Sequence, residues 1–347
     1  MKKILVGLVF GGKSGEHEVS VRSAKSIFEA LDKVKYEVSL LGVDKTGGWH
    51  KVDQKWLPQG GEMKSLPSGD KSLVVQEQKI DVFFPMIHGS FGEDGCLQGL
   101  LELMNVPYVG AGVLGSAVGM DKDVQKRLMM QAGIPVARYI SLSSSLSLKN
   151  FQIPFRFPLF VKPANMGSSV GISKCKSKGK LMQAIKEALK YDTKVIIEEE
   201  VKGRELEVSV LGNRNPLASV PGEVIPMGKH EFYDFEAKYL DEKGAIIQIP
   251  AKNLSLRKIK EIRDLAIETY KTLECSGMAR VDMFMRLNGQ LVINEINTLP
   301  GFTSISMYPK LWEATGLKYS DLLDKLIELA LERKREKDKL KRSFDGL

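Results

Sequence analysis

Residues 279–297 read ARVDMFMRLNGQLVINEIN, and this stretch decides the fold of the C-terminal part of the chain. Two apolar runs flank Asn288-Gly289, which is the strongest short signal for a β-hairpin. We expect a two-residue type I′ turn, with Leu287 opposite Gln290. That turn fixes the register of every pair farther along the two strands.

In this register Asp282 lies opposite Glu295, and Arg280 lies opposite Asn297. Side chains alternate along a strand, so all four lie on one face. Two carboxylates directly opposite each other repel, and we therefore expect a cation between them. Asp, Glu and Asn oxygens suit Mg²⁺ or Mn²⁺, and the lack of Cys or His argues against zinc. The prediction is that Asp282, Glu295 and Asn297 hold the magnesium of a nucleotide. The alternative is a solvent-facing strand edge in which Arg280 bridges Glu295 diagonally.

The bulk composition limits the class of protein. A chain of 347 residues predicts two or three domains. A net charge of +8 favours anionic partners, either nucleic acid or small phosphates. The basic stretch at 332–342 continues an apolar-periodic segment, so we interpret it as the solvated end of a helix and expect no nucleic-acid partner.

The cysteines and the N-terminus indicate the compartment. Cys96, Cys175 and Cys275 are far apart and form no C-x-x-C pair, which argues against a disulfide framework and suits the cytoplasm. The apolar run at 4–10 leads into a Gly-rich turn without a cleavage site, so it predicts a first strand rather than a signal peptide. No segment approaches the roughly 20 apolar residues of a membrane span, and we expect no membrane partner.

The pattern over residues 1–118 alternates between strand and helix, which predicts a doubly wound parallel sheet. The expected strands are 4–10, 36–43, 80–89 and 106–110. Residues 45–75 are rich in Gly, Lys, Pro and Ser, and they indicate a surface excursion. Beyond residue 118 the pattern indicates two further α/β modules, with a site where the three meet.

Two segments of the middle region could contact a nucleotide. Residues 161–173 read VKPANMGSSVGIS, where glycines and hydroxyls suit phosphate and Lys162 supplies a counter-charge. The alternative is a plain surface loop. Residues 195–208 place three glutamates after an apolar strand, which suits adenine and ribose but is by itself typical of a solvated face.

Residues 7–14, GLVFGGKS, match the P-loop pattern G-x-x-x-x-G-K-S. In a true P-loop the first Gly ends the strand, whereas here residues 8–10 continue it. We expect instead a Gly-rich turn that presents Glu16 at a helix N-terminus, where it could hold a substrate ammonium. His88 ends another strand, where doubly wound sheets place ligands, and a purely structural role is equally open. A P-loop kinase using Lys13 and a basic nucleic-acid-binding protein stay as competing hypotheses.

Eight segments together resemble the D-alanine–D-alanine ligases of the ATP-grasp superfamily: GGKSGEHEVS, HGSFGEDGCLQGLLE, MDKDVQK, VKPANMGSSVG, IIEEEVKGRELEVSVLG, EFYDFEAKY, ARVDMF and INEINTLPGFTSISMYP. The resemblance implies a three-domain ATP-grasp fold. Its parts would be an N-terminal substrate-binding α/β domain (1–118), a central ATP-grasp domain (119–201) and a C-terminal catalytic domain (202–347). It also implies that ATP phosphorylates the carboxylate of one D-alanine, and that the amine of a second D-alanine displaces the phosphate to give the dipeptide of peptidoglycan.

The resemblance also implies residue roles. The metal ligands, for Mg²⁺ or Mn²⁺ and for two ions, would be Asp282, Glu295 and Asn297, the set that the hairpin register predicts independently. The ATP contacts would be Lys122, Lys162, Ser169, Glu198, Glu199, Val201, Glu205 and Lys238. The substrate contacts would be Glu16, His88, Arg280, Ser306 and Met307. Glu16, Ser168 and Tyr239 would form a hydrogen-bonded trio over the site, and Arg280 with the N–H of Gly301 would stabilise the oxyanion. A homodimer is implied by the resemblance alone, as is the preference of the Tyr239 loop for D-alanine over D-lactate.

Overall fold

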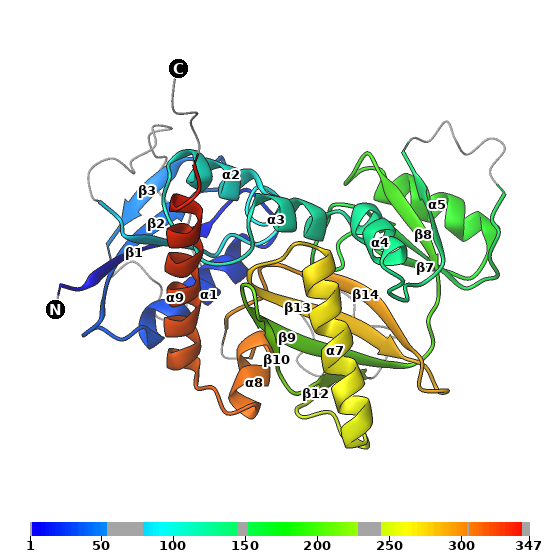
Figure 1. The fold of residues 1–347 in the computed structure, drawn as a ribbon. Helices are drawn as coiled ribbons and strands as arrows, with labels where there is room; N and C mark the ends of the chain where they lie inside the picture. The colour runs from blue at the N-terminus through cyan, green and yellow to red at the C-terminus, as the bar shows by residue number, and fades with distance from the viewer. Residues whose placement is uncertain (1, 54–78, 144–151, 228–243, 304, 342–347) are drawn as a thin grey trace.

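The computed structural model describes residues 2–53, 79–143, 152–227, 244–303 and 305–341 (Figure 1). Three β-sheets lie in succession along the chain, over residues 4–85, 139–199 and 204–297. Two predicted site residues, Lys238 and Tyr239, fall outside the described residues. The division of the chain into domains at residues 118 and 201 stays a prediction.

The first sheet has the order β3-β2-β1-β4, with β1 (Ile4–Gly11), β2 (Tyr36–Val43), β3 (Trp49–Val52) and β4 (Val82–Pro85). Strand β1 is parallel to both of its neighbours, as predicted. The prediction that 45–75 is a surface excursion is wrong for its first part. Trp49–Val52 form β3, which pairs antiparallel with β2, and Val52 is buried. The strand expected at 106–110 is reduced to a single bridge between Phe83 and Tyr108.

Helices α1 (His17–Ala30), α2 (Cys96–Leu103) and α3 (Val113–Met120) accompany this sheet. Helix α3 has no clear signal in the sequence, since Gly115 and Gly119 lower helix propensity. Its packing explains those glycines. A Cβ at Gly115 would lie 2.6 Å from the carbonyl oxygen of Glu274, and one at Gly119 would lie 2.6 Å from a methyl of Thr298.

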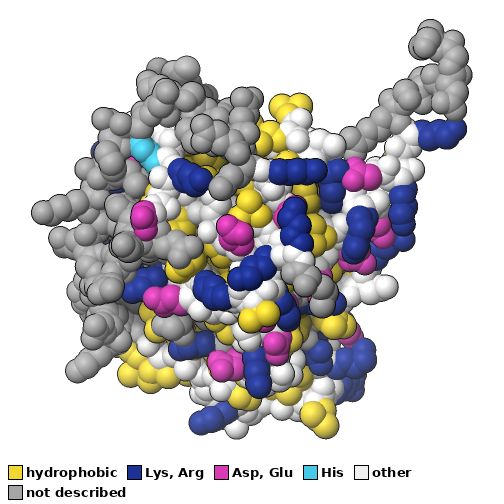
Figure 2. Space-filling view, turned by 90° about the vertical axis from the view of Figure 1, so that its left-hand side faces the viewer, with side chains coloured by type: hydrophobic (Ala, Val, Ile, Leu, Met, Phe, Trp, Pro, Cys, Tyr) yellow, Lys and Arg dark blue, Asp and Glu magenta, His cyan; other side chains and the backbone are white. Residues whose placement is uncertain are grey.

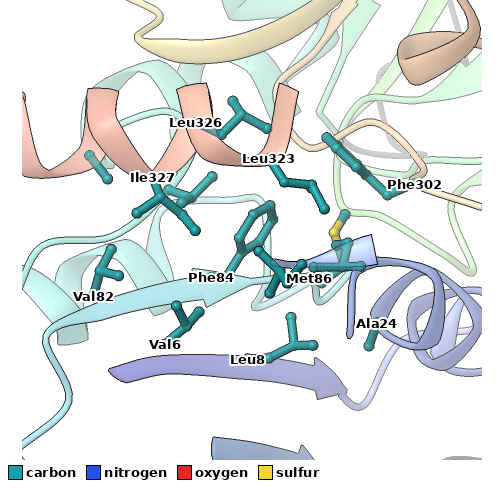
Figure 3. Close-up of a cluster of buried hydrophobic side chains, with 14 of the residues drawn as sticks. Val6, Leu8, Ala24, Val82, Phe84, Met86, Phe302, Leu323, Leu326 and Ile327 are labelled. Atoms are coloured by element: carbon teal, nitrogen blue, oxygen red, sulfur yellow. The ribbon is translucent and has the colours of Figure 1, made fainter. Parts of the chain in front are cut away.

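The last helix, α9 (Tyr319–Asp338), lies beside the first sheet although it belongs to the end of the chain (Figure 1). Leu323, Leu326 and Ile327 of α9 pack over Phe84 and Met86 in one buried cluster (Figure 3). Each such fully buried side chain contributes roughly 1.5–3 kcal/mol through removal from water. The C-terminal helix is therefore part of the N-terminal core.

The basic end of α9 is not wholly solvated, which corrects the sequence interpretation. Arg333 donates from Nη2 to the carbonyl of Tyr108 at 2.7 Å and from Nη1 to the hydroxyl of Ser276 at 2.6 Å. Lys337 forms an ion pair with Glu102. These contacts join α9 to the first sheet, so part of the basic stretch has a structural role.

The second sheet has the order β5-β8-β6-β7, formed by β5 (Tyr139–Leu142), β8 (Val195–Glu199), β6 (Leu159–Pro163) and β7 (Ser173–Cys175). Helix α5 (Lys178–Ala188) packs on it through buried apolar side chains. Helix α4 (Lys122–Gln131) precedes the sheet, begins at the N-cap Asp121 and is followed by Gly133.

The third sheet has the order β12-β11-β9-β13-β14, with β10 paired to β9. Its strands are β9 (Arg204–Gly212), β10 (Leu217–Ala218), β11 (Gly222–Pro226), β12 (Ala245–Gln248), β13 (Gly277–Met285) and β14 (Leu291–Asn297). Helix α7 (Leu256–Thr272) packs on one face of this sheet, and α8 (Met307–Ala314) packs against β9.

The β13–β14 hairpin confirms the predicted pairs and corrects the turn. Asp282 is opposite Glu295 and Arg280 is opposite Asn297. The loop, however, holds three residues, because Arg286 pairs with Gln290 and Gly289 has a left-handed φ of +83°. This shifts the register by one. A bulge at Asn294 of β14, opposite the step from Asp282 to Met283 on β13, shifts it back.

Candidate active site

Two adjoining cavities lie between the three sheets, and Glu295 lines both. The smaller cavity, of about 230 Å³, gathers predicted residues from distant segments: Glu16, His88, Ser168, Arg280, Glu295, Asn297, Gly301, Ser306 and Met307. The larger cavity, of about 500 Å³, is lined by a second predicted set: Lys162, Ser169, Glu198, Glu199, Val201, Glu205, Asp282 and Glu295. Lys122 is not among the lining residues, but its Nζ lies 3.3 Å from Oε2 of Glu295, the residue that the two cavities share.

The two facing carboxylates of the hairpin each have their own cation. Arg280 donates to both oxygens of Asp282 at 2.7 Å, and Asn297 Nδ2 donates to Asp282 Oδ2 at 2.9 Å. Lys122 forms an ion pair with Glu295. Arg280 also lies 2.9 Å from Glu207, and these two carboxylates raise its pKa well above the usual range although burial opposes this. Arg280 therefore pairs along its own strand and with β9, and the diagonal bridge to Glu295 of the alternative interpretation is not among the ion pairs found within the described residues.

The donor set of the hairpin fits a magnesium ion. All three side chains carry oxygen donors and line one or both cavities, and Mg²⁺ usually takes one or two carboxylates and leaves positions for phosphate. Within the described ranges no group of three or more His, Cys, Asp or Glu side chains is placed to hold a metal by itself. A pair of carboxylates with an amide suits an ion that arrives with a phosphate.

A buried cluster of charges lies behind the larger cavity. Glu198 forms ion pairs with both Lys162 and Lys126, the latter at 3.1 Å. Burial alone would raise the pKa of Glu198, but the two ammonium groups outweigh it and hold the pKa at about 2. Its carboxylate is thus committed to two lysines, which limits the contact with adenine or ribose that the resemblance assigned to Glu198.

Lys126 was missed by sequence reasoning. It lies one helical turn after Lys122 on α4, so the spacing puts both ammonium groups on one face of the helix. That spacing was the signal available in the sequence. It is a weak one, because lysines three or four residues apart are common on solvated helix faces.

The Gly/Ser segment closes over the smaller cavity through Ser168, whose hydroxyl donates to Glu16 Oε1. Glu16 is the N-cap residue of α1, where the prediction placed it. Ser168 and Ser169 both adopt left-handed φ values, of +51° and +60°. A Cβ at Gly167 would lie 3.1 Å from Glu16 Oε2, so a side chain there would crowd the Glu16 carboxylate.

His88 is buried in the wall of the same cavity. Its Nδ1 donates to the carbonyl of Leu299 at 3.1 Å, so Nε2 accepts from the Ser23 hydroxyl at 3.3 Å. Burial lowers the pKa of His88 and keeps the ring neutral. The structure therefore gives His88 a positioning role between β4 and the Leu299 segment, in addition to its place at the cavity.

Glu93 is a second residue that sequence reasoning missed. It lines the smaller cavity and accepts a hydrogen bond from the backbone N–H of Gly89. Burial and the nearby Glu16 carboxylate raise the pKa of Glu93 well above its ordinary value. Two acidic groups therefore lie close together where the resemblance placed only Glu16.

The segment after the hairpin forms the opposite wall. Ser306 is the N-cap residue of α8, and its hydroxyl accepts from the backbone N–H of Thr303 at 3.0 Å. Met307 is buried against Gly222, where a Cβ would lie 2.7 Å from the Met307 methyl. Gly301 lies beside Ser306, and a Cβ there would meet the Ser306 hydroxyl at 2.8 Å.

The P-loop alternative is contradicted by the backbone. Strand β1 continues through Leu8, Val9 and Phe10 to Gly11. Lys13 is exposed and lies over the Phe91 ring, 5.1 Å from its centroid. The G-x-x-x-x-G-K-S match is thus a strand followed by a turn.

The fold and the two cavities are those of an ATP-grasp ligase. In this class of enzyme two α+β domains enclose the nucleotide. Family models for the N-terminus and the C-terminus of D-ala D-ala ligase match residues 5–111 and 128–328. The chain belongs to the D-alanine–D-alanine ligase family.

Relatives match over nearly the whole chain. A D-alanine–D-alanine ligase of Oceanobacillus iheyensis is 48% identical, over 99% of each chain. D-alanine–D-alanine ligase A of Chromobacterium violaceum is 50% identical, again over 99% of each. The solved D-alanine-D-alanine ligase of Coxiella burnetii has a TM-score of 0.83 at 39% identity, covering 98% of this chain and 97% of that one. VanG D-Ala:D-Ser ligase of Enterococcus faecalis gives 0.82 at 35%, covering 95% and 100%.

Proposed function

We propose that this enzyme joins two D-alanine molecules at the expense of ATP, through an acyl phosphate, to supply the dipeptide of peptidoglycan. The observation that carries the proposal is the pair of adjoining cavities that share Glu295. One cavity is lined by groups for an amino acid, the other by groups for a nucleotide. A phosphoryl group can pass between them only where they meet.

The larger cavity would hold ATP. Lys162 and Lys122 supply positive charge near the hairpin, and Ser169, Glu199, Val201 and Glu205 line the space where adenine and ribose would lie. Glu199 is held by Arg138, whose Nε donates to it at 2.7 Å. Phosphoryl transfer needs positioning and charge neutralisation more than covalent help, and this set provides both. Lys238 would complete it.

Asp282, Glu295 and Asn297 would hold Mg²⁺ or Mn²⁺, as one or two ions, which when bound would offset the charge of the transferring phosphoryl group. The residues of the chain do the rest. Glu295 lies at the junction, so it orients the donor against the acceptor. Lys122 donates to the carbonyl of Met166 at 2.8 Å and thereby links the Gly/Ser segment to this junction.

The smaller cavity would hold both D-alanines. Glu16 would accept the ammonium of the first, since its carboxylate lies at a helix N-terminus beside His88. Arg280 and the N–H of Gly301 would stabilise the tetrahedral oxyanion, a kind of contact that typically contributes ~3 kcal/mol. Ser306 and Met307 would grip the carboxylate of the second D-alanine. Ser168, bonded to Glu16, would exclude water from the acyl phosphate, and Tyr239 would join them.

The test is phosphate release from ATP with D-alanine, L-alanine, D-serine or D-lactate, with the product identified by mass. We expect release with D-alanine and a product of two alanines. D-Serine is included because VanG, a D-Ala:D-Ser ligase, shares the fold. No stimulation by D-alanine would refute the proposal.

Two further features are proposed on the resemblance. The enzyme would be a homodimer, which sedimentation can test, and it would act in the cytoplasm. The cysteines Cys96, Cys175 and Cys275 are all free thiols, which suits a reducing compartment. In the part of the chain that the structure describes, no helix is both long and apolar enough to cross a bilayer.

On the face in Figure 2, Lys and Arg are interspersed with Asp and Glu, which favours a solvated surface over a nucleic-acid stripe.

A further inference from the structure

Lys126 of α4 is a buried cation for which the proposed chemistry has given no role. Its side chain is 1% exposed, and burial lowers its pKa. A buried ammonium is costly unless it is paired and hydrogen-bonded. Lys126 Nζ lies 3.1 Å from Glu198 Oε2 and donates to the carbonyl of Asn294 at 3.3 Å.

Lys162 shares both of these partners. It pairs with the other oxygen of Glu198 and donates to the side-chain oxygen of Asn294 at 3.2 Å. The two lysines thus hold both oxygens of one carboxylate and both oxygens of one asparagine. Lys162 lines the larger cavity, whereas Lys126 lies behind it and reaches the cavity wall through Glu198 and Asn294.

Asn294 is the residue at the bulge of the β13–β14 hairpin. The pairing changes there, from Met283 opposite Ile293 to Asp282 opposite Glu295. Without the bulge, the three-residue loop would leave Asp282 opposite Asn294, and the Glu295 side chain would point to the other face. Whatever fixes the backbone at Asn294 therefore fixes the carboxylate pair.

We propose that Lys126 is a positioning residue for nucleotide and metal: it holds the bulge at Asn294, which keeps Glu295 facing Asp282, and it orients Glu198 so that Lys162 faces the phosphates. This rests on the proposed function, since it assigns Lys126 to the machinery that binds ATP with its metal. A merely structural lysine would affect stability alone. A positioning lysine also changes the dependence on nucleotide and magnesium, and leaves the D-alanine cavity largely as it was.

The test compares Lys126→Met with the matched control Lys258→Met. Lys258 also donates to a carbonyl of this hairpin, that of Gly289 at 2.8 Å, but at the loop end far from Glu295. Binding of a non-hydrolysable ATP analogue is measured by calorimetry over a range of Mg²⁺. For Lys126→Met we expect about a tenfold or larger rise in the dissociation constant and in the half-saturating Mg²⁺, as for other groups that orient metal ligands. Lys258→Met should match the wild type in both, and Lys126→Arg should recover part of the loss.

A folded Lys126→Met protein that binds the analogue and Mg²⁺ like the wild type would overturn the inference, as would an equal loss in Lys258→Met. Circular dichroism checks folding, and if Lys126→Met does not fold, Lys126→Gln is measured in the same way. The KM for D-alanine should change less than about twofold, because the D-alanine cavity stays largely as it was. Analogue binding needs no D-alanine, so absence of dipeptide synthesis in the wild type would refute the proposed function and leave this test readable.

Discussion

Glu295→Gln removes one charge from the carboxylate pair at the junction of the two cavities and keeps the shape of the side chain. Glu295 is partly exposed and its ion pair with Lys122 spans 3.3 Å. Gln keeps a hydrogen-bond acceptor for Lys122, so only the charge component of this partly buried pair is lost, which is worth roughly 1 kcal/mol. The change also relieves repulsion from Asp282, which is worth roughly 0.2–1 kcal/mol across a strand pair. The two terms oppose each other, so we expect the free energy of unfolding to change by less than about 1 kcal/mol, or a few degrees in Tm.

The effect on catalysis should be far larger. Glu295 is proposed to hold the ion that offsets the charge of the transferring phosphoryl group, and loss of one such stabilising contact typically costs ~3–4 kcal/mol, or roughly 10²- to 10³-fold in rate. Part of that loss is weaker metal binding, so raising Mg²⁺ should recover some of the activity. The assay is D-alanine-dependent phosphate release as a function of Mg²⁺, with Tm measured on the same samples.

Glu102→Gln is the matched control, since Glu102 is also a partly exposed glutamate paired with a lysine, and it lies away from both cavities. We expect that variant to keep the wild-type Mg²⁺ dependence. Normal turnover of Glu295→Gln at low Mg²⁺ would refute the metal assignment. A fall in Tm of ten degrees or more would instead show that Glu295 is needed for the fold.

Three other changes test separate parts of the site. Ser168→Ala removes the bond to Glu16 that closes the loop, so we expect the ratio of phosphate released to dipeptide formed to rise above one as water enters. Glu93→Gln should raise Tm at pH 8 and leave it nearly unchanged at pH 5, measured by calorimetry. The raised pKa of Glu93 means that its charged form is disfavoured in the folded state. The wild-type protein therefore loses stability as the pH rises above about 4.5, the pKa of Glu93 in the unfolded chain. An equal shift at both pH values would contradict this. Lys13→Ala should leave the KM for ATP within about twofold, and a large rise would revive the P-loop hypothesis.

The hairpin shows how a correct prediction can rest on a partly wrong premise. The Asn288-Gly289 signal identified the hairpin and the facing pairs, yet the loop is one residue longer than the two-residue turn. The bulge at Asn294 cancels the error before the site is reached. A bulge depends on what the extra residue contacts, here two lysines from other elements, and the local sequence carries no mark of them.

Other features escaped the sequence for a similar reason. Lys126 and Glu93 matter because they are enclosed with other charges, and enclosure is decided by how segments far apart in the chain pack. Helix α3 is glycine-rich because its neighbours approach closely, so propensity argued against it. The location of Glu16, in the turn between β1 and α1, and of His88, just after β4, at one cavity was predictable, because doubly wound sheets open their clefts at the carboxyl ends of the strands irrespective of loop detail.

The facing carboxylates also show that a divalent ion is not needed to make their arrangement tolerable, because Arg280 and Lys122 already serve one each. The ion pairs of the two carboxylates differ. Asp282 is buried and held by two short bonds from Arg280, whereas Glu295 has a longer and more exposed ion pair. Asp282→Asn should therefore lower the free energy of unfolding by about 3 kcal/mol, since it breaks a buried pair and leaves Glu207 as the carboxylate that the described residues place within ion-pair distance of Arg280. Urea titration of Asp282→Asn beside Glu295→Gln measures this difference. Equal stability of the two variants would mean that Arg280 does not hold Asp282 in solution, and that both carboxylates are equally available to the metal.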